Sequence, residues 1–249
     1  MPATTRYILG IDDTDMPGTR GTGALARMLA ATLGSEGLGQ VTCITRHQLY
    51  RHPSVPFTSQ NSSASLDLSC ADPSALFEFT ARFVAGESPE GSDPGIAMAA
   101  WDKINQEMVR WGRMAKSRLL SRTGAHSIAS ESELMLRGLG GSHDGIIGAL
   151  ASLGLRRFGD DGRVLWHHRR ALRELDGRMK VAELERLSGA SVMEAGTETM
   201  LDSGITIETN GWVRPSWSAH AEILYAHRKQ DEEDVWQLLT KEELLALGR

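Results

Sequence analysis

Three aspartates follow a short apolar run near the start of the chain. Asp12, Asp13 and Asp15 come directly after residues 7–11, and an apolar run that stops at polar and turn residues is typical of a buried strand. Carboxylates this close repel one another and raise each other's pKa unless a cation lies between them. Mg²⁺ binds a few carboxylates together with water and phosphate oxygens. The cluster therefore predicts a site for Mg²⁺ and phosphate, and a solvated acidic turn is the alternative.

The next residues supply a loop and a helix start that could receive a phosphate. Residues 16–23 form a loop by their glycine and proline content, and apolar residues recur at helical spacing over 24–33. Backbone N–H groups at such a helix start bind phosphate well. Thr22 could cap this helix, or its hydroxyl could face or accept a phosphate. The glycines of the loop are Gly18, Gly21 and Gly23.

A second glycine-rich loop, 138–145, opens an apolar helix predicted over 146–153. His143 and Asp144 come just before the start of this helix, where they could orient an amine or a phosphate. Asp144 could equally cap the helix, since aspartate is a preferred capping residue.

The remaining elements must position these two loops. We predict one long amphipathic helix over 101–119 and an acidic amphipathic helix over 231–247. The loop 86–95 is a candidate domain boundary because it is rich in glycine, proline and serine. Strands and helices alternate without a clean parallel pattern, which favours an α+β fold over a doubly wound sheet.

Composition narrows the function classes. The chain has 249 residues, with 27 Lys plus Arg against 32 Asp plus Glu and a formal charge of −5. A net acidic chain is a poor candidate for a generic nucleic-acid binder. Two cysteines are too few for a disulfide framework or a cysteine-rich zinc module. There is no signal-peptide pattern and no apolar run long enough to span a membrane, so we expect a cytoplasmic protein with reduced thiols.

Five motifs, in order along the chain, carry a resemblance to a known family. They are 10–15 with Gly21-Thr22 and Leu25-Ala26; 55–57 with Ala64; 93–95; 145–151; and 224–228. This series resembles the archaeal tRNA-isoleucine 2-agmatinylcytidine synthetases, over the catalytic region of that family. The resemblance implies a kinase-like α/β domain that binds ATP and Mg²⁺, combined with a ferredoxin-like α+β domain that helps to bind agmatine. The corresponding bounds are 1–95 together with 195–249 for the kinase-like domain and 96–194 for the ferredoxin-like domain.

The resemblance also implies roles for individual residues. Asp12, Asp13 and Asp15 would hold Mg²⁺ and take part in catalysis, and Thr22 falls on the family's phosphorylated threonine. Implied cofactor-binding residues are Gly18, Gly21, Thr22, Gly23, Asn61 and Ser62. Implied substrate-binding residues are His143, Asp144, Gly145, Gly148, Tyr225 and Arg228.

The chain departs from the family at several positions. Gly21 and Gly23 replace a cysteine and a threonine, and Thr58 and Gln60 replace a lysine and an arginine that could face phosphates. The family's oligonucleotide-binding barrel and zinc ribbon are not expected in this chain. We therefore expect a nucleotide and a small amine as partners, no membrane, and a homodimer as one option. A tRNA is a further option that neither the charge nor the domain content supports.

Three functions follow from these observations. The first is an ATP- and Mg²⁺-dependent phosphotransferase or ligase acting on a small molecule. The second is a catalytically degenerate homologue that binds a ligand or a partner. The third is a phosphatase with an aspartate nucleophile, suggested by Asp13-Thr14-Asp15 after a strand.

Overall fold

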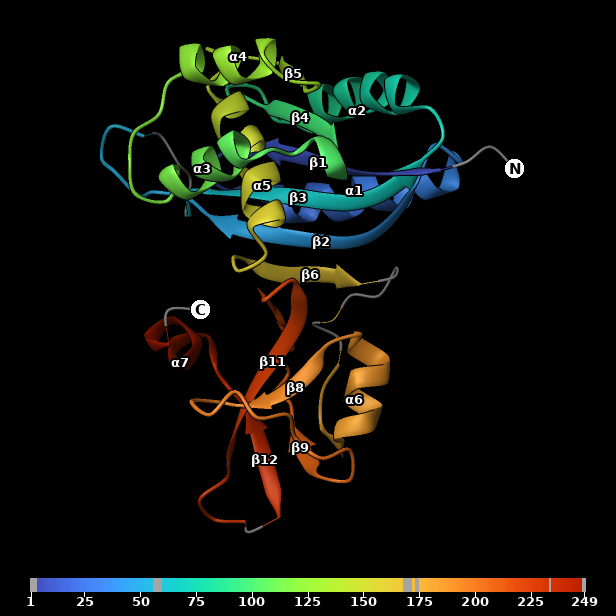
Figure 1. Cartoon of the computed structure of the whole chain (residues 1–249), viewed down its shortest axis with the longest axis vertical. Coiled ribbons are helices and arrows are strands. Elements are labelled where there is room, and N and C mark those ends of the chain that lie inside the picture. The colour runs from blue at the N-terminus through green and yellow to red at the C-terminus, as the bar shows by residue number, and fades with distance from the viewer. Residues whose placement is uncertain (1–3, 56–59, 168–171, 173–174, 233, 248–249) are drawn as a thin grey trace. The chain divides into compact units, whose positions relative to one another are not determined.

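A computed structural model describes residues 4–55, 60–167, 172, 175–232 and 234–247. The chain divides into two units, Met1–Phe158 and Gly159–Arg249, and each is described by itself (Figure 1). Both units combine helices with strands, so the mixed helix-and-strand class is confirmed.

An antiparallel sheet forms the centre of the first unit. Its strands lie in the order β5-β4-β1-β3-β2. The elements of this unit are β1 (Thr5–Asp12), α1 (Thr22–Ser35), β2 (Gln40–Gln48), β3 (Ser62–Cys70), α2 (Pro73–Glu87), β4 (Gly95–Ala100), η1 (Trp101–Lys103), α3 (Gln106–Met114), α4 (Arg122–Ser130), β5 (Met135–Gly138) and α5 (Gly145–Phe158). From β1 to β4 the order is β-α-β-β-α-β, which is the split β-α-β topology.

Helices cover the two faces of this sheet. The helix α5 packs on β1, β3 and β4, whereas α1 packs on β2 and β3 and against α2 (Figure 1). Glycine permits the close approach of α5: a Cβ on Gly10 of β1 would overlap the carbonyl oxygen of Ala149. The apolar residues between α5 and the sheet, such as Ile8 and Leu150, are fully buried. The end of β1 is thereby held beside the start of α5.

The second unit is built on a mixed set of strands. Its elements are β6 (Arg163–His167), β7 (Arg178–Lys180), α6 (Val181–Ser188), β8 (Ser191–Glu194), β9 (Thr206–Glu208), β10 (Ser216–Ser218), β11 (Ala221–Arg228), β12 (Val235–Leu238) and α7 (Lys241–Ala246). The strand β12 pairs antiparallel with β11 and parallel with β9, and β8 pairs parallel with β11.

The division of the chain differs from the expected bounds of 1–95 with 195–249 and of 96–194. The loop 86–95 is not a boundary, because β4 begins at Gly95 and pairs with β1 in the same sheet. The first unit continues through α5 to Phe158. The split β-α-β topology lies at the beginning of the chain, where the kinase-like domain was expected.

Two predicted helices are wrong in part. The helix expected over 101–119 is interrupted, since the Asn105 side chain accepts N–H bonds from Glu107 and Met108 and starts α3 there. The helix expected over 231–247 is replaced by β12 followed by α7. Thr240 starts α7 with a capping box, in which its hydroxyl and the Glu243 carboxylate bond each other's backbone N–H.

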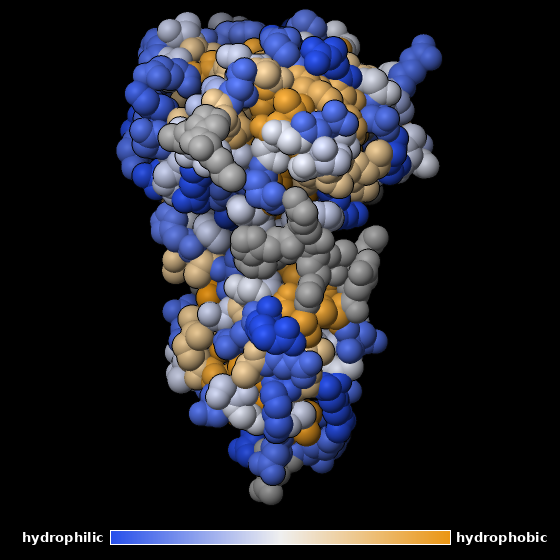
Figure 2. All heavy atoms as spheres, turned by 90° about the vertical axis from the view of Figure 1, so that its right-hand side faces the viewer, coloured by the Kyte–Doolittle hydropathy of each residue, from blue (hydrophilic) through white to orange (hydrophobic). Residues whose placement is uncertain are grey.

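No helix of the described residues is both long and apolar enough to cross a membrane. The face in Figure 2 is largely hydrophilic, with smaller hydrophobic areas in each unit.

Candidate functional site

The aspartates after β1 are held in two directions by neighbouring helices. Asp12 is only 9% exposed and its carboxylate lies against α5, where a Cβ on Gly148 would overlap Oδ2. Asp15 lies toward α1 instead: a Cβ on Gly21 would be 3.6 Å from its Oδ2. The loop after β1 therefore spans the space between the starts of α5 and α1.

Asp13 occupies a strained position between these two carboxylates. Its φ is 53°, in the left-handed region that few residues other than glycine, asparagine and aspartate adopt. Burial, followed by the charges of Asp93, Asp15 and Asp144, raises the pKa of Asp13 to about 6. A backbone held in this conformation next to repelling charges is the kind of local strain found at functional sites.

Burial has a larger effect on Asp12. Burial comes first among the causes that raise the pKa of Asp12 to about 8, followed by the charges of Asp13 and Asp15. A hydrogen bond with the Asp13 backbone acts in the opposite direction. A bound cation would offset the negative potential that these carboxylates produce.

Asp93 joins the second glycine-rich loop to this site. Its carboxylate accepts backbone N–H bonds from Ser142 at 3.1 Å, His143 at 2.7 Å and Asp144 at 3.0 Å. Gly145 is needed here, since its Cβ would overlap the Asp93 carbonyl oxygen. The loop that contains His143 and Asp144 is thus held by Asp93, whose charge also acts on Asp13.

The side chains at this second loop already have partners. Asp144 forms an ion pair with Arg122 of α4 at 3.1 Å and accepts a hydrogen bond from Ser142 Oγ at 2.7 Å. His143 has a φ of 68°, so it also adopts the left-handed conformation. Both residues are exposed and stay accessible to a ligand.

The start of α1 has no side-chain cap. Gly21 is the N-cap residue, and Thr22 is the first residue of the helix instead of its cap. Thr22 is 7% exposed, and its hydroxyl accepts a hydrogen bond from Thr14 Oγ1 at 3.1 Å. The first N–H groups of α1 therefore face the loop without a side-chain acceptor, as expected of a phosphate-binding helix start.

Sequence reasoning missed Arg46, a cation beside this arrangement. Arg46 lies on β2, and its Nε donates to Ser62 Oγ of β3 at 3.0 Å. Burial and the charge of Arg51 lower the pKa of Arg46, whereas the charge of Asp15 raises it. The available signal was its place directly after residues 41–45, which are typical of a strand, because a charged residue next to buried strand residues is rarely tolerated without a partner.

The other predicted binding residues have mixed roles. Asn61 donates its amide to the Tyr50 carbonyl at 2.6 Å, which fixes the β2–β3 connection. Pro56, Phe57 and Thr58 lie outside the described residues. Gly18 has a φ of 83° in the loop, and Gly23 lies in the first turn of α1.

Tyr225 and Arg228 lie in the second unit. Both belong to β11, where Tyr225 is buried in an apolar cluster with Ile223 and Leu239. The Tyr225 hydroxyl is 3.5 Å from Ser218 Oγ. Tyr225 thus packs the interior of the second unit, and a substrate role for the two residues stays a prediction.

No three His, Cys, Asp or Glu side chains among the described residues are close enough together to form a preassembled metal centre. The aspartates nevertheless supply the oxygen ligands that Mg²⁺ prefers, and the raised pKa values of Asp12 and Asp13 favour a cation. Mg²⁺ also keeps several waters and phosphate oxygens in its shell, so it needs few protein ligands.

Gly148→Ala should destabilise the protein, although alanine normally stabilises a helix relative to glycine. The added Cβ would overlap Asp12 Oδ2, so α5 or the aspartate must move. We expect a loss of about 1–3 kcal/mol, typical of overpacking, and a fall in Tm of roughly 5 °C. Gly86→Ala in α2 is the matched control because its Cβ would have nothing within 4 Å. Differential scanning calorimetry checks both, and an unchanged or higher Tm for Gly148→Ala contradicts the packing argument.

No protein-family model matches the chain, and no curated protein matches it. Several solved structures of TiaS, a tRNA agmatidine synthetase, are similar to it in fold. The complex of TiaS with its isoleucine tRNA and ATP aligns with a TM-score of 0.53 at 22% identity, covering 60% of this chain and 36% of that one. The chain shares its fold with part of TiaS.

Two further TiaS structures give the same result. The complex of TiaS with tRNA, AMPCPP and agmatine aligns with a TM-score of 0.51 at 22% identity, and apo TiaS with 0.51 at 21%. The likeness spans about a third of the TiaS chain, 35% to 36% of its length. The resemblance in motifs is thus accompanied by a resemblance in fold, and the specific pairing of a kinase-like with a ferredoxin-like domain is not confirmed.

Proposed function

We propose that the first unit binds ATP together with Mg²⁺ at the loop between β1 and α1 and uses it for phosphotransferase or ligase chemistry. The observation that carries this proposal is the convergence of three aspartates, the uncapped start of α1 and Arg46. The likeness in fold to TiaS, which has been crystallised with ATP and AMPCPP, supports it.

Each part of the site has a defined task in this proposal. Asp13 and Asp15 would hold Mg²⁺ together with Asp12, and their negative charge keeps free anions out unless the metal is present. The first N–H groups of α1 and the guanidinium of Arg46 would bind phosphate oxygens. Bound Mg²⁺–ATP would supply an electrophilic phosphorus whose developing charge the metal neutralises.

We further propose that an amine substrate binds at the loop before α5. Asp93 and Asp144 provide negative charge there, and Asp144 already binds the guanidinium of Arg122. An amine or guanidine group could replace that interaction. One TiaS complex contains agmatine and tRNA, which favours an RNA-modifying reaction at least as much as one restricted to small molecules.

Calorimetric titration with ATP tests the proposal. Mg²⁺ should strengthen ATP binding to the wild type about tenfold, and Asp13→Asn should remove that gain. Asparagine tolerates the left-handed conformation as well as aspartate does, so this change removes the charge without adding backbone strain. Glu36→Gln, an exposed carboxylate at the end of α1, is the matched control and should keep the Mg²⁺ effect.

Two outcomes separate the alternatives. Absence of ATP binding with or without Mg²⁺ would refute the proposed site. Tight Mg²⁺-dependent binding without ATP turnover, in the presence of tRNA and agmatine, would favour the catalytically degenerate homologue.

A further inference from the structure

A pocket of about 320 Å³ lies in the second unit, at the ends of two neighbouring strands. The strands β9 and β12 run parallel, with Gln237 paired to Glu208, and the segments that follow them line the pocket. In open α/β sheets, ligands bind outside the carboxyl ends of parallel strands. The pocket occupies the corresponding place between this parallel pair.

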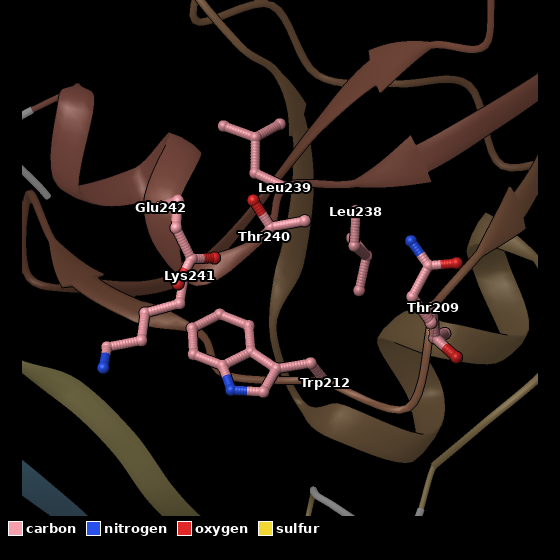
Figure 3. Close-up of a pocket in the computed structure, with 8 residues that line it drawn as sticks. Thr209, Trp212, Leu238, Leu239, Thr240, Lys241 and Glu242 are labelled. Carbon is pink, nitrogen blue, oxygen red and sulfur yellow. The ribbon is translucent and has the colours of Figure 1, made fainter.

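The pocket combines an aromatic ring, an apolar floor and a cation. Figure 3 shows Trp212 with Lys241 beside its indole ring and with Leu238 and Leu239 above it in this view. Both leucines are buried, whereas Trp212 is half-buried and packs against the apolar cluster that contains Tyr225. The ring is therefore held in place while part of it stays open to the pocket.

Positive charge surrounds the ring. The guanidinium carbons of Arg163 and Arg214 lie 5.2 Å and 6.0 Å from the Trp212 ring centroid. Lys241 is exposed and has no ion-pair partner among the residues that the structure describes. Glu242 is the one carboxylate in the pocket lining. Lys241 is therefore the cation of the pocket lining that could bind an anionic group of a ligand.

Asn210 adds a polar group at the edge of the pocket. It has a φ of 52° and is followed by Gly211 at 63°, so a tight turn presents its exposed side chain. An asparagine amide can both donate to and accept from the polar edge of a purine base.

We propose that this pocket binds a nucleotide, with its base stacked on Trp212 and its phosphate at Lys241. A half-open tryptophan beside cationic side chains is the arrangement that binds single nucleotides and unpaired bases. The ligand is either a free nucleotide or one nucleotide of a single-stranded RNA. The site is separate from the proposed Mg²⁺–ATP site of the first unit and does not depend on it.

Titration with AMP in the presence of EDTA tests the pocket alone. EDTA removes Mg²⁺ and so weakens nucleotide binding at the aspartates of the first unit. A second titration uses the Asp13→Asn variant. AMP should bind to this variant and to the wild type with equal affinity. AMP should also bind more tightly than adenosine, which lacks the phosphate.

Variants at the pocket then separate stacking from charge. Trp212→Ala should weaken AMP binding about tenfold, and Trp212→Phe, which keeps an aromatic ring, should largely restore it. Lys241→Gln should weaken the binding of AMP but not of adenosine. Glu242→Gln is the matched control and should leave AMP binding unchanged or stronger.

The affinities for AMP and for a short oligoadenylate distinguish a free nucleotide from a nucleotide of single-stranded RNA. Oligoadenylate binding more than about tenfold tighter than AMP identifies single-stranded RNA, and similar affinities identify a free nucleotide. The proposal would be overturned if the wild type bound neither AMP nor oligoadenylate. It would also be overturned if neither Trp212→Ala nor Lys241→Gln changed the affinity for AMP. Neither result would bear on Mg²⁺-dependent ATP binding by the first unit.

Discussion

Asp12→Asn should raise the Tm of the free protein by roughly 5 °C at about pH 8 and weaken Mg²⁺–ATP binding about tenfold, which is the whole gain expected from the metal. The aspartate is buried against α5 beside two further carboxylates, and its pKa is raised to about 8. Asparagine has nearly the same shape and carries no charge, so it removes the repulsion and one metal ligand together. A variant that is more stable but binds less tightly is expected where a metal-binding residue lowers the stability of the free protein.

The raised pKa of Asp12 determines whether the free energy of unfolding rises or falls with pH. The pKa of Asp12 is higher in the folded protein than in the unfolded chain, so the folded state binds more protons between the two values. The free energy of unfolding therefore falls as pH rises from about 4 to about 8, and the penalty is complete above that range. The Tm difference between Asp12→Asn and the wild type should thus be small at about pH 4, approach its full value at about pH 8 and stay constant above it.

Thermal unfolding across this pH range, with and without Mg²⁺, measures the effect. Mg²⁺ should raise the Tm of the wild type and leave that of Asp12→Asn nearly unchanged. Glu36→Gln should follow the wild type at every pH. A lower Tm for Asp12→Asn at about pH 8 would show that the carboxylate stabilises the free protein and would contradict the prediction.

The sequence was sufficient to predict the local part of the site. The apolar run before Asp12, the glycine loop and the helix after it are contiguous, so their patterns specify β1, the loop and α1 without tertiary information. The same holds for the start of α5, where the glycines at 145 and 148 lie in the first turn of an apolar helix. These segments are confirmed in the structure.

The partners that complete the site depend on long-range pairing. Arg46 reaches the loop because β2 pairs with β3, and Asp93 does so because β4 pairs with β1. The position of Asp93 was ambiguous in the sequence, since it lies in a loop that resembles a domain boundary. No local pattern states which strands are neighbours, so these contacts could not be predicted.

The acidic segment 231–247 shows a different limit. Charged residues at regular intervals around Trp236 and Leu239 fit a helix, but Val235–Leu238 pairs with strands on both sides. A short segment with a β-branched and an aromatic residue can adopt either structure, and tertiary pairing decides. This error also concealed the pocket, because its lining follows the end of β12.

Asp67→Ala should produce the largest loss of stability in the first unit. The carboxylate of Asp67 is buried on β3 and binds Arg6 through both oxygens, at 2.9 Å and 2.6 Å, and Arg156 of α5 at 3.1 Å. The Arg156 side chain is 3% exposed, whereas that of Arg6 is 46% exposed. Removing Asp67 breaks this buried ion pair of Arg156, whose guanidinium also donates to Thr45 Oγ1 at 3.1 Å, and breaking a buried pair typically costs about 3–5 kcal/mol.

A double-mutant cycle distinguishes this cause from the loss of packing. Asp67→Ala alone should lower the Tm by roughly 10 °C, and Arg6→Met should have a small effect because solvent already reaches that guanidinium. Adding Arg156→Met to Asp67→Ala should recover much of the loss, since the buried charge whose ion pair was broken is then removed. Equal destabilisation in the single and double variants would instead assign the effect to the cavity left by Asp67.

The ion pair lies at the last turns of α5, whereas the aspartate site lies at the first turns of this helix. Any of these variants that stays folded should therefore keep its Mg²⁺-dependent ATP affinity.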